Sequence, residues 1–159
     1  MVDISNMTDK DVSIFSLKGH VSHCKVVKII DGDSINIICY GLDGEIIKVN
    51  ARLMGIDTPE LNVYPHLAKS ARNYLIQLVT NVEIDVDDER SCKELQTLID
   101  QNTKLLIAKF GSEDKYGRQL VELYNDISDI DVYSRSINHM MIASKRARYY
   151  DGGKKQSWV

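Results

Sequence analysis

The stretch from Ala51 to Glu60 reads Ala-Arg-Leu-Met-Gly-Ile-Asp-Thr-Pro-Glu. An apolar run separates Arg52 from Asp57 and Glu60, a pattern typical of a strand that leaves a core and carries charged side chains to a site at its end. On a regular strand, the odd spacing between Arg52 and Asp57 would place their side chains on opposite faces. Gly55 therefore indicates a bulge that re-aims the residues beyond it, and Pro59 stiffens the corner that follows.

The same stretch has a second, purely structural interpretation. Asp57, followed three positions later by Glu60, fits a capping box at the start of a helix. The two carboxylates would then satisfy backbone N–H groups instead of serving a site. The stretch alone does not decide between these interpretations.

Length and composition limit the class of protein. With 159 residues and an ordinary hydrophobic fraction of 43%, the chain is expected to fold as one globular domain. It has no apolar run long enough to cross a membrane, and we expect no signal peptide. Its cysteines, Cys24, Cys39 and Cys92, have no disulfide-framework spacing, so we expect reduced thiols in an intracellular, cytoplasmic protein.

The net charge of −3 is unusual for a protein that binds nucleic acid, but it is unevenly distributed. The segment from Glu83 to Asp100 holds seven acidic and two basic residues, so it accounts for −5 and leaves the rest of the chain at +2. From Ser136 onward there are five basic residues and one acidic residue. The C-terminal part of the chain is therefore locally basic.

Hydrophobic periodicity and turn signals divide the chain into short elements. Asp31-Gly32-Asp33, residues 41–44 and the stretch from Asp114 to Arg118 are turn signals between runs rich in β-branched residues. Strands are expected at 21–30, 34–40, 45–53, 105–110 and 120–124, with a short strand or extended edge over Val82, Ile84 and Val86. Helices are expected at 66–79, 92–100 and 132–144, with Ser91 and Asp131 as the N-caps of the last two.

This order of elements predicts the fold class. A three-stranded meander, a helix, further strands and a helical tail fit an α+β, mainly β protein: a five-stranded OB-fold barrel with about three helices. Residues 1–18 are expected to form a poorly ordered N-terminal arm, and residues 19–159 the domain itself. Barrels of this type commonly bind oligonucleotides.

Charged groups gather at the predicted strand ends. Asp31-Gly32-Asp33 and Asp57-Thr58-Pro59-Glu60 each supply two carboxylates, and Arg52 and Arg118 supply two guanidinium groups. Oxygen ligands without cysteine or histidine point to Ca²⁺ or Mg²⁺. Guanidinium groups match the non-bridging oxygens of a phosphate, and Glu60 remains to take a proton from water.

Each piece alone has an ordinary structural explanation. Asp-Gly-Asp is most often a turn, the stretch from Asp114 to Arg118 is equally a hairpin loop, and Arg52 beside a carboxylate is most often a salt bridge. The joint occurrence of these pieces in this order favours a site that acts on phosphates.

In these motifs the chain resembles the staphylococcal nuclease (thermonuclease) family. The matching stretches are Ile30-Asp31-Gly32-Asp33-Ser34, Arg52 to Glu60, and Asp114-Lys115-Tyr116-Gly117-Arg118. Asn138 before an apolar run and an aromatic residue near Gly-Gly-Lys extend the likeness, which covers the chain from Val21 to Trp158 with one interruption. The order and internal spacing of the motifs make the resemblance specific.

The resemblance implies roles for the matching residues. Glu60 orients and activates the attacking water, while Arg52 and Arg118 clamp the phosphate. Ca²⁺ is held by the carboxylates of Asp33 and Asp57 and by the backbone carbonyl of Thr58. The remaining roles are contacts to a terminal phosphate from Lys115 and Tyr116, a nucleotide pocket lined by Tyr150 or Tyr149, and shaping of the metal site by Asp31.

The implied activity is Ca²⁺-dependent hydrolysis of phosphodiester bonds in DNA and RNA. Water attacks in line, the 5′-oxygen leaves, and the products end in 3′-phosphates. Single-stranded or frayed nucleic acid is the expected partner of a monomeric chain that contacts no membrane.

Some features depart from the family pattern. Ser34 stands where threonine is common but keeps the hydroxyl group, and residues 61–66 leave only a short loop beyond Glu60, which could alter rate or substrate preference. The acidic segment at about 82–101 looks at least partly like an insertion. It could be a packing decoration, a partner-binding surface, or a negative gate near the substrate path.

Two other functions stay open. An OB-fold module that binds nucleic acid or a protein without cleavage would share the fold, although inactive relatives usually lose a metal ligand or an arginine, and this chain retains both. A small-molecule phosphohydrolase would need the same chemistry and no polymer, but the basic tail argues against it.

Overall fold

The computed structural model describes residues 3–85 and 92–158. The strands and helices of this part of the chain are β1 (Val21–Ile29), β2 (Ser34–Tyr40), β3 (Ile46–Leu53), β4 (Ile56–Asp57), α1 (Pro65–Thr80), α2 (Cys92–Asn102), β5 (Leu106–Glu113), β6 (Gln119–Tyr124), α3 (Ile137–Ala143) and β7 (Arg148–Tyr149). Short 3₁₀ turns lie at Asp9–Asp11, Ile127–Asp129 and Tyr133–Arg135.

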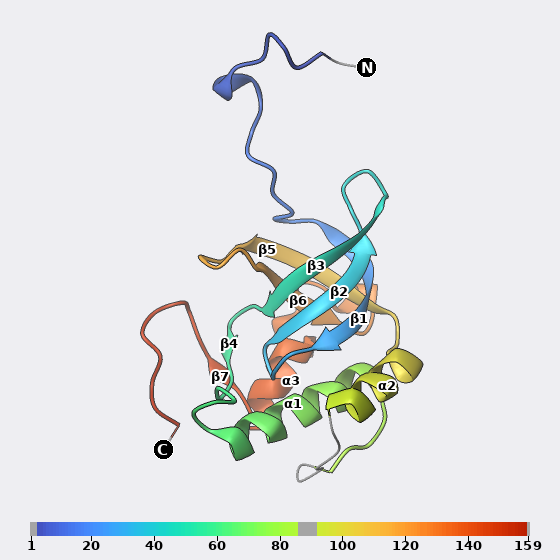
Figure 1. The fold of residues 1–159 in the computed structure, drawn as a ribbon, viewed down its shortest axis with the longest axis vertical. Helices are drawn as coiled ribbons and strands as arrows, with labels where there is room; N and C mark the ends of the chain where they lie inside the picture. The colour runs from blue at the N-terminus through green and yellow to red at the C-terminus, as the bar shows by residue number, and fades with distance from the viewer. Residues whose placement is uncertain (1–2, 86–91, 159) are drawn as a thin grey trace.

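Five strands close into a barrel in the order β1-β2-β3-β6-β5, which confirms the predicted α+β, OB-like fold (Figure 1). Neighbouring strands run antiparallel except β3 and β6, which close the barrel as a short parallel pair. Alternate residues of β1 and β2 point inward, because successive side chains on a strand face opposite sides of the sheet. Outside the barrel, β4 and β7 pair with each other.

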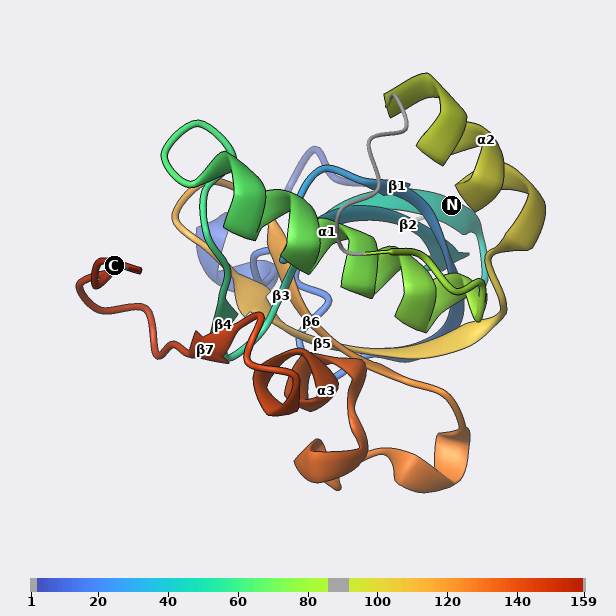
Figure 2. The same ribbon diagram turned by 90° about the horizontal axis from the view of Figure 1, so that it is seen from below.

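The helices cover one end of the barrel (Figures 1 and 2). α1 buries Ala71, Leu75 and Val79 in the barrel core, and α3 adds Ile137 and Met141. α2 builds a second, smaller core, in which residues from α1, α2 and the segment between them meet: Ile76, Ile84, Leu95, Leu98 and Ile99. The described part of the acidic segment therefore has a packing role, and α2 lies on the opposite side of the molecule from β4 and β7 in both views.

Most expected elements are confirmed, with three differences. Residues 82–85 form no strand, while Val86 and Ser91 lie outside the described residues. Asp131 does not cap the last helix: it has a φ of 70° and pairs with Lys109. The cap is Ser136, whose hydroxyl oxygen accepts a hydrogen bond from the N–H of His139 at 3.0 Å. The helix is accordingly shorter than expected and follows a separate 3₁₀ turn.

The chain enters the barrel at Leu17. Residues 3–16 are all exposed and project from the body as an arm, whereas Leu17 is buried in the core (Figure 1). Among the described residues, no helix is both long enough and apolar enough to span a bilayer.

Candidate functional site

The turn between β1 and β2 delivers Asp33 into the protein. The carboxylate of Asp31 accepts hydrogen bonds from the N–H groups of Asp33 and Ser34 at 3.1 and 2.9 Å, which shapes this turn as expected. A Cβ atom at Gly32 would lie 2.8 Å from the Cβ of Ala71. Only glycine therefore lets the turn approach α1 this closely.

Asp33 is buried, with hydrogen-bond donors, one positive and one negative side chain around it. Its carboxylate accepts hydrogen bonds from the N–H of Thr58 at 3.1 Å and from the Ser34 hydroxyl at 3.2 Å, and it lies 3.2 Å from Nη1 of Arg52. Burial raises the pKa of Asp33 to about 7, the negative charge of Asp31 acts in the same direction, and Arg52 opposes them. Arg52 alone therefore compensates the negative charge of the buried Asp33 carboxylate poorly.

The turn at Gly55 brings Asp57 back to Arg52. Gly55 has a φ of 82°, a left-handed conformation that lets the chain turn between β3 and β4. The Nη2 atom of Arg52 then donates to the Ile56 carbonyl at 3.1 Å and lies 3.5 Å from Oδ1 of Asp57. The residues beyond Gly55 are re-aimed as predicted, but by a turn between two strands and not by a bulge within one. The capping-box interpretation is wrong, because Asp57 belongs to β4 and the next helix begins at Pro65.

Asn138 fixes this turn from behind. It is fully buried, and its Nδ2 donates to the carbonyls of Met54 and Val121 at 2.9 and 3.0 Å, while its Oδ1 accepts from the N–H of Leu123 at 3.1 Å. The hydroxyl of Tyr133 also donates to the Met54 carbonyl, at 3.2 Å. Because all these groups are paired, the corner that carries Asp57 is held on a rigid support.

The hairpin between β5 and β6 carries Arg118. The Asp114 carboxylate accepts hydrogen bonds from the N–H and the Nε–H of Arg118, both at 2.9 Å. The Nη1 atom of Arg118 donates to the Ser34 hydroxyl at 3.0 Å, and that hydroxyl donates in turn to Asp33. The second guanidinium group is thus oriented toward the same carboxylate cluster as the first.

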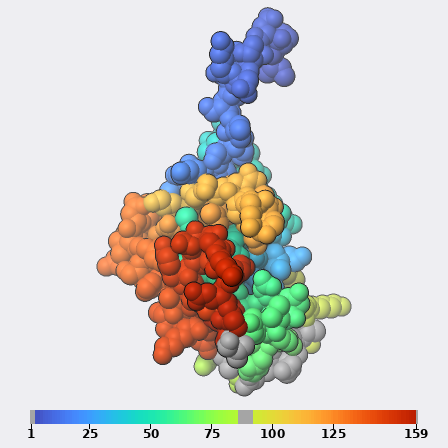
Figure 3. All heavy atoms as spheres, turned by 90° about the vertical axis from the view of Figure 1, so that its left-hand side faces the viewer, coloured from blue at the N-terminus to red at the C-terminus, as the bar shows by residue number. Residues whose placement is uncertain are grey.

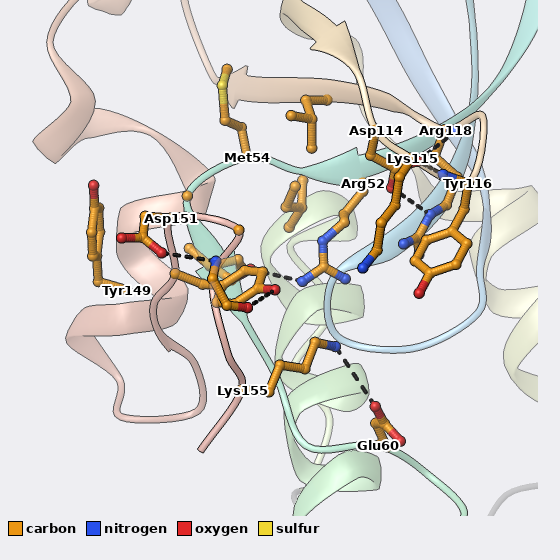
Figure 4. Close-up of a pocket in the computed structure, with 17 residues that line it drawn as sticks. Arg52, Met54, Glu60, Asp114, Lys115, Tyr116, Arg118, Tyr149, Asp151 and Lys155 are labelled. Atoms are coloured by element: carbon orange, nitrogen blue, oxygen red, sulfur yellow. Dashed lines mark hydrogen bonds and ion pairs between the residues drawn. The ribbon is translucent and has the colours of Figure 1, made fainter.

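Two connected cavities meet at these residues. One has a volume of about 830 Å³ and the other about 520 Å³. Both are lined by the same five side chains, which come from four different segments of the chain: Arg52, Glu60, Tyr116, Arg118 and Lys155 (Figure 4). The smaller cavity also reaches Asp31, Asp33 and Thr58.

No protein-family model and no curated protein matches this chain. The resemblance to the nuclease family therefore stays a prediction, and the chemistry of the site has to be argued from its own geometry.

The residues expected to contact substrate lie around the larger cavity. Lys115 and Tyr116 stand at its hairpin end, where the Lys115 ammonium group is 5.2 Å from the centroid of the Tyr116 ring. Tyr150 is adjacent to Arg52, whose guanidinium carbon lies 5.6 Å from the Tyr150 ring centroid. Tyr149 is 72% exposed and lies at the opposite end of the cavity from Tyr116 (Figure 4).

The expected cation ligands have the chemistry that a hard divalent cation needs. Asp33 and Asp57 contact different terminal nitrogens of Arg52, Nη1 and Nη2, and the buried Oδ1 of Asp57 accepts no hydrogen bond, although it has ion-pair contacts with Arg52 and Lys155. A buried carboxylate oxygen that accepts no hydrogen bond, close to a second carboxylate held by the same arginine, has the hard-oxygen chemistry that Ca²⁺ prefers. Among the described residues, no group of three or more His, Cys, Asp or Glu side chains is placed to hold a metal, and the ligand set implied by the resemblance contains only two carboxylates beside the Thr58 carbonyl.

Three contributors were not predicted from the sequence in these roles. Lys155 pairs with Asp57, Asp114 orients Arg118, and the Ser34 hydroxyl links Arg118 to Asp33. Asp114 and Ser34 stand inside the recognised motifs, so their positions gave a signal. Lys155 gave none, because its contact depends on how the C-terminal segment folds back.

Proposed function

We propose that the protein is a Ca²⁺-dependent nuclease that hydrolyses phosphodiester bonds of DNA and RNA and leaves 3′-phosphate ends. The observation that carries this proposal is the convergence of Arg52, Arg118 and Glu60 on two cavities, the smaller of which also reaches the buried carboxylate of Asp33. Phosphodiester hydrolysis requires guanidinium groups that bind the phosphate, a carboxylate that water can reach, and oxygen ligands for a divalent cation.

The arginines bind and orient the phosphate. A guanidinium group offers two parallel N–H donors to non-bridging phosphate oxygens, and its charge stabilises the added negative charge at phosphorus in the transition state. Both guanidinium groups are already oriented by carboxylates, Arg52 by Asp33 and Asp57 and Arg118 by Asp114. Little conformational freedom then remains to be lost when substrate binds.

Glu60 is placed to take the proton from the attacking water. Its side chain lines both cavities and is 55% exposed, so water can reach the carboxylate. The water oxygen bonds to phosphorus while the opposite bond from phosphorus to the 5′-oxygen breaks. The 5′-oxygen leaves with the bonding electron pair and takes a proton from solvent, and the 3′-oxygen keeps the phosphate. Asp33, Asp57 and the Thr58 carbonyl would hold Ca²⁺, which supplies charge for phosphate binding and for water activation when bound.

A non-catalytic binding module is the second candidate. The observation that favours it is that Arg52 is buried and already satisfied by Asp33, Asp57 and the Ile56 carbonyl. A guanidinium group with all these partners would stabilise the fold and would not bind a phosphate. The exposed Lys115 and Tyr116 would then bind nucleic acid without cleavage.

Cleavage assays separate the two candidates. Full-length protein is incubated with single-stranded DNA and RNA oligonucleotides, with Ca²⁺ or with chelator, and the product ends are analysed. We expect cleavage only with Ca²⁺, 3′-phosphate ends, and a loss of about 10²- to 10⁴-fold in Glu60→Gln, the range for a removed general base. Arg118→Ala should also be strongly impaired, whereas Arg135→Ala, an exposed arginine paired with Asp129, should retain activity. Binding without cleavage under every divalent ion would rule out the enzyme.

A further inference from the structure

The C-terminal segment, residues 150–158, lies across the site as a strap. Figure 3 shows it in red on the face that also carries the segment following β4 and the hairpin between β5 and β6. The N–H of Tyr150 donates to the Gly55 carbonyl at 2.8 Å and fastens the start of the strap to the turn. The strap therefore begins where the site's own corner is held.

Contacts at the far end also hold the strap. The Nη2 atom of Arg148 donates to the carbonyls of Gln156 and Ser157 at 2.8 and 3.1 Å, and its guanidinium carbon lies 3.7 Å from the Trp158 ring centroid. The hydroxyl groups of Tyr64 and Ser157 are 3.0 Å apart. With both ends anchored, the middle of the strap has a defined place.

That place puts the Lys155 ammonium group between two carboxylates of the site. Its Nζ lies 3.2 Å from Oδ1 of Asp57. It also lies 3.6 Å from Oε1 of Glu60 (Figure 4). Oδ1 of Asp57 is the same buried oxygen that accepts no hydrogen bond, and Nη2 of Arg52 lies 3.5 Å from it. Lys155 thus contributes a positive charge at the oxygen best suited to a divalent cation.

We propose that Lys155 competes with the divalent cation for Asp57, so that the strap lowers the cation affinity of the site; this rests on the proposed function, which assigns Asp57 as a cation ligand. Two positive charges a few ångströms apart repel strongly outside bulk water, so Lys155 has to leave Oδ1 of Asp57 before a cation can bind there. The same departure removes its contact with Glu60. Cation binding and release of the general base are thereby coupled.

Calorimetric titration with Ca²⁺ at fixed ionic strength tests the competition. Lys155→Met keeps a side chain of similar length without charge, Lys155→Arg keeps the charge, and Lys154→Met removes the charge of the exposed neighbouring lysine. We expect half-saturation at a Ca²⁺ concentration about two- to fivefold lower in Lys155→Met than in wild type, the range that a partly exposed ion pair supports. Lys155→Arg and Lys154→Met should both stay near the wild-type value.

The single tryptophan, Trp158, reports whether the strap stays docked in the variants, since it stacks on Arg148. In cation-free Lys155→Met we expect the tryptophan emission of the wild type. A shifted emission would assign any affinity change to loss of the strap and overturn the direct competition.

Equal Ca²⁺ affinity in Lys155→Met and Lys154→Met would overturn the direct competition as well. A shifted affinity without nucleic-acid cleavage would overturn the nuclease and leave the competition intact. Absence of Ca²⁺ binding in every variant would overturn both.

Discussion

Two glycines determine where the carboxylates of the site lie, for different physical reasons. Gly32 is required by space, because Ala71 and Thr58 leave no room for a Cβ atom. Gly55 is required by conformation as well, because its φ of 82° lies in the left-handed region. A Cβ atom there would also lie 2.8 Å from the Tyr133 hydroxyl, the group that donates to the Met54 carbonyl.

Replacing Gly55 by alanine should therefore cost more than backbone strain. Gly44 is the matched control, with a φ of 80° and no atom within 4 Å of the position that a Cβ atom would take. We expect Gly44→Ala to lower the free energy of unfolding by about 1 kcal/mol. Gly55→Ala should lose about 1–3 kcal/mol more through overpacking against Tyr133. Urea unfolding measures both, and equal losses in the two variants would show that the Tyr133 contact relaxes without cost.

At the residue scale, the sequence identified those site residues that stand close together in one motif. Arg52, Asp57 and Glu60 stand in one stretch around a glycine, so their types and spacing indicated a corner that brings charges together. Lys155 is about a hundred residues away, in a basic segment whose sequence gave no indication of a contact with Asp57. Its contact with Asp57 depends on the pairing of β4 with β7, two strands of two residues each, too short to show any periodicity.

At the scale of elements, the hairpin of β5 and β6 depends on one titrating side chain. Partial burial pushes the pKa of Asp114 upward, but hydrogen bonds from the N–H groups of Arg118 and Tyr116 and the charge of Arg118 outweigh it. The pKa of Asp114 therefore lies below its ordinary value of 3.8. A carboxylate with a lowered folded-state pKa stabilises the protein above its unfolded-state pKa, and this contribution disappears as the pH falls through the folded-state value.

The stability difference between wild type and Asp114→Ala should follow that titration. We expect a difference in unfolding free energy of about 1–3 kcal/mol at neutral pH, from the lost hydrogen bonds, that shrinks as the pH drops below about 4. Asp114→Asn keeps an acceptor and has no titrating group, so its difference from Asp114→Ala should not vary with pH. Denaturant unfolding at a series of pH values measures both differences. A wild-type difference that stays constant down to pH 3 would contradict this role of Asp114.

The third helix shows where element prediction from sequence reaches its limit. Asp131 and Ser136 are both residue types favoured at an N-cap, and they stand five positions apart. The choice between them is made by tertiary contacts: Asp131 turns outward to Lys109 with a positive φ, and the Ser136 hydroxyl accepts from the N–H of His139. Strand positions were easier, because inward and outward residues alternate along the chain.

At the scale of the whole molecule, barrel closure follows from contacts that no local pattern contains. The sequence indicated five strands, but the parallel pairing of β3 with β6 joins residues far apart in the chain. The chain enters this barrel at Leu17, where the N–H of Gly19 donates to the Phe110 carbonyl at 2.8 Å and the N–H of His20 to the Leu17 carbonyl at 2.9 Å. Residues 3–16 precede these bonds and bury none of their side chains.

Removal of residues 1–16 should therefore leave the barrel intact. Ile14 and Phe15, the largest apolar groups near the junction, are 93% and 72% exposed, so little hydrophobic burial is lost. We expect the free energy of unfolding to change by less than about 0.5 kcal/mol. Leu17→Ala in the full chain is the contrasting variant and should cost about 2–5 kcal/mol, because Leu17 is buried in the core. Thermal and urea unfolding compare the two variants. A truncated chain as unstable as Leu17→Ala would show that the arm packs on the barrel in solution.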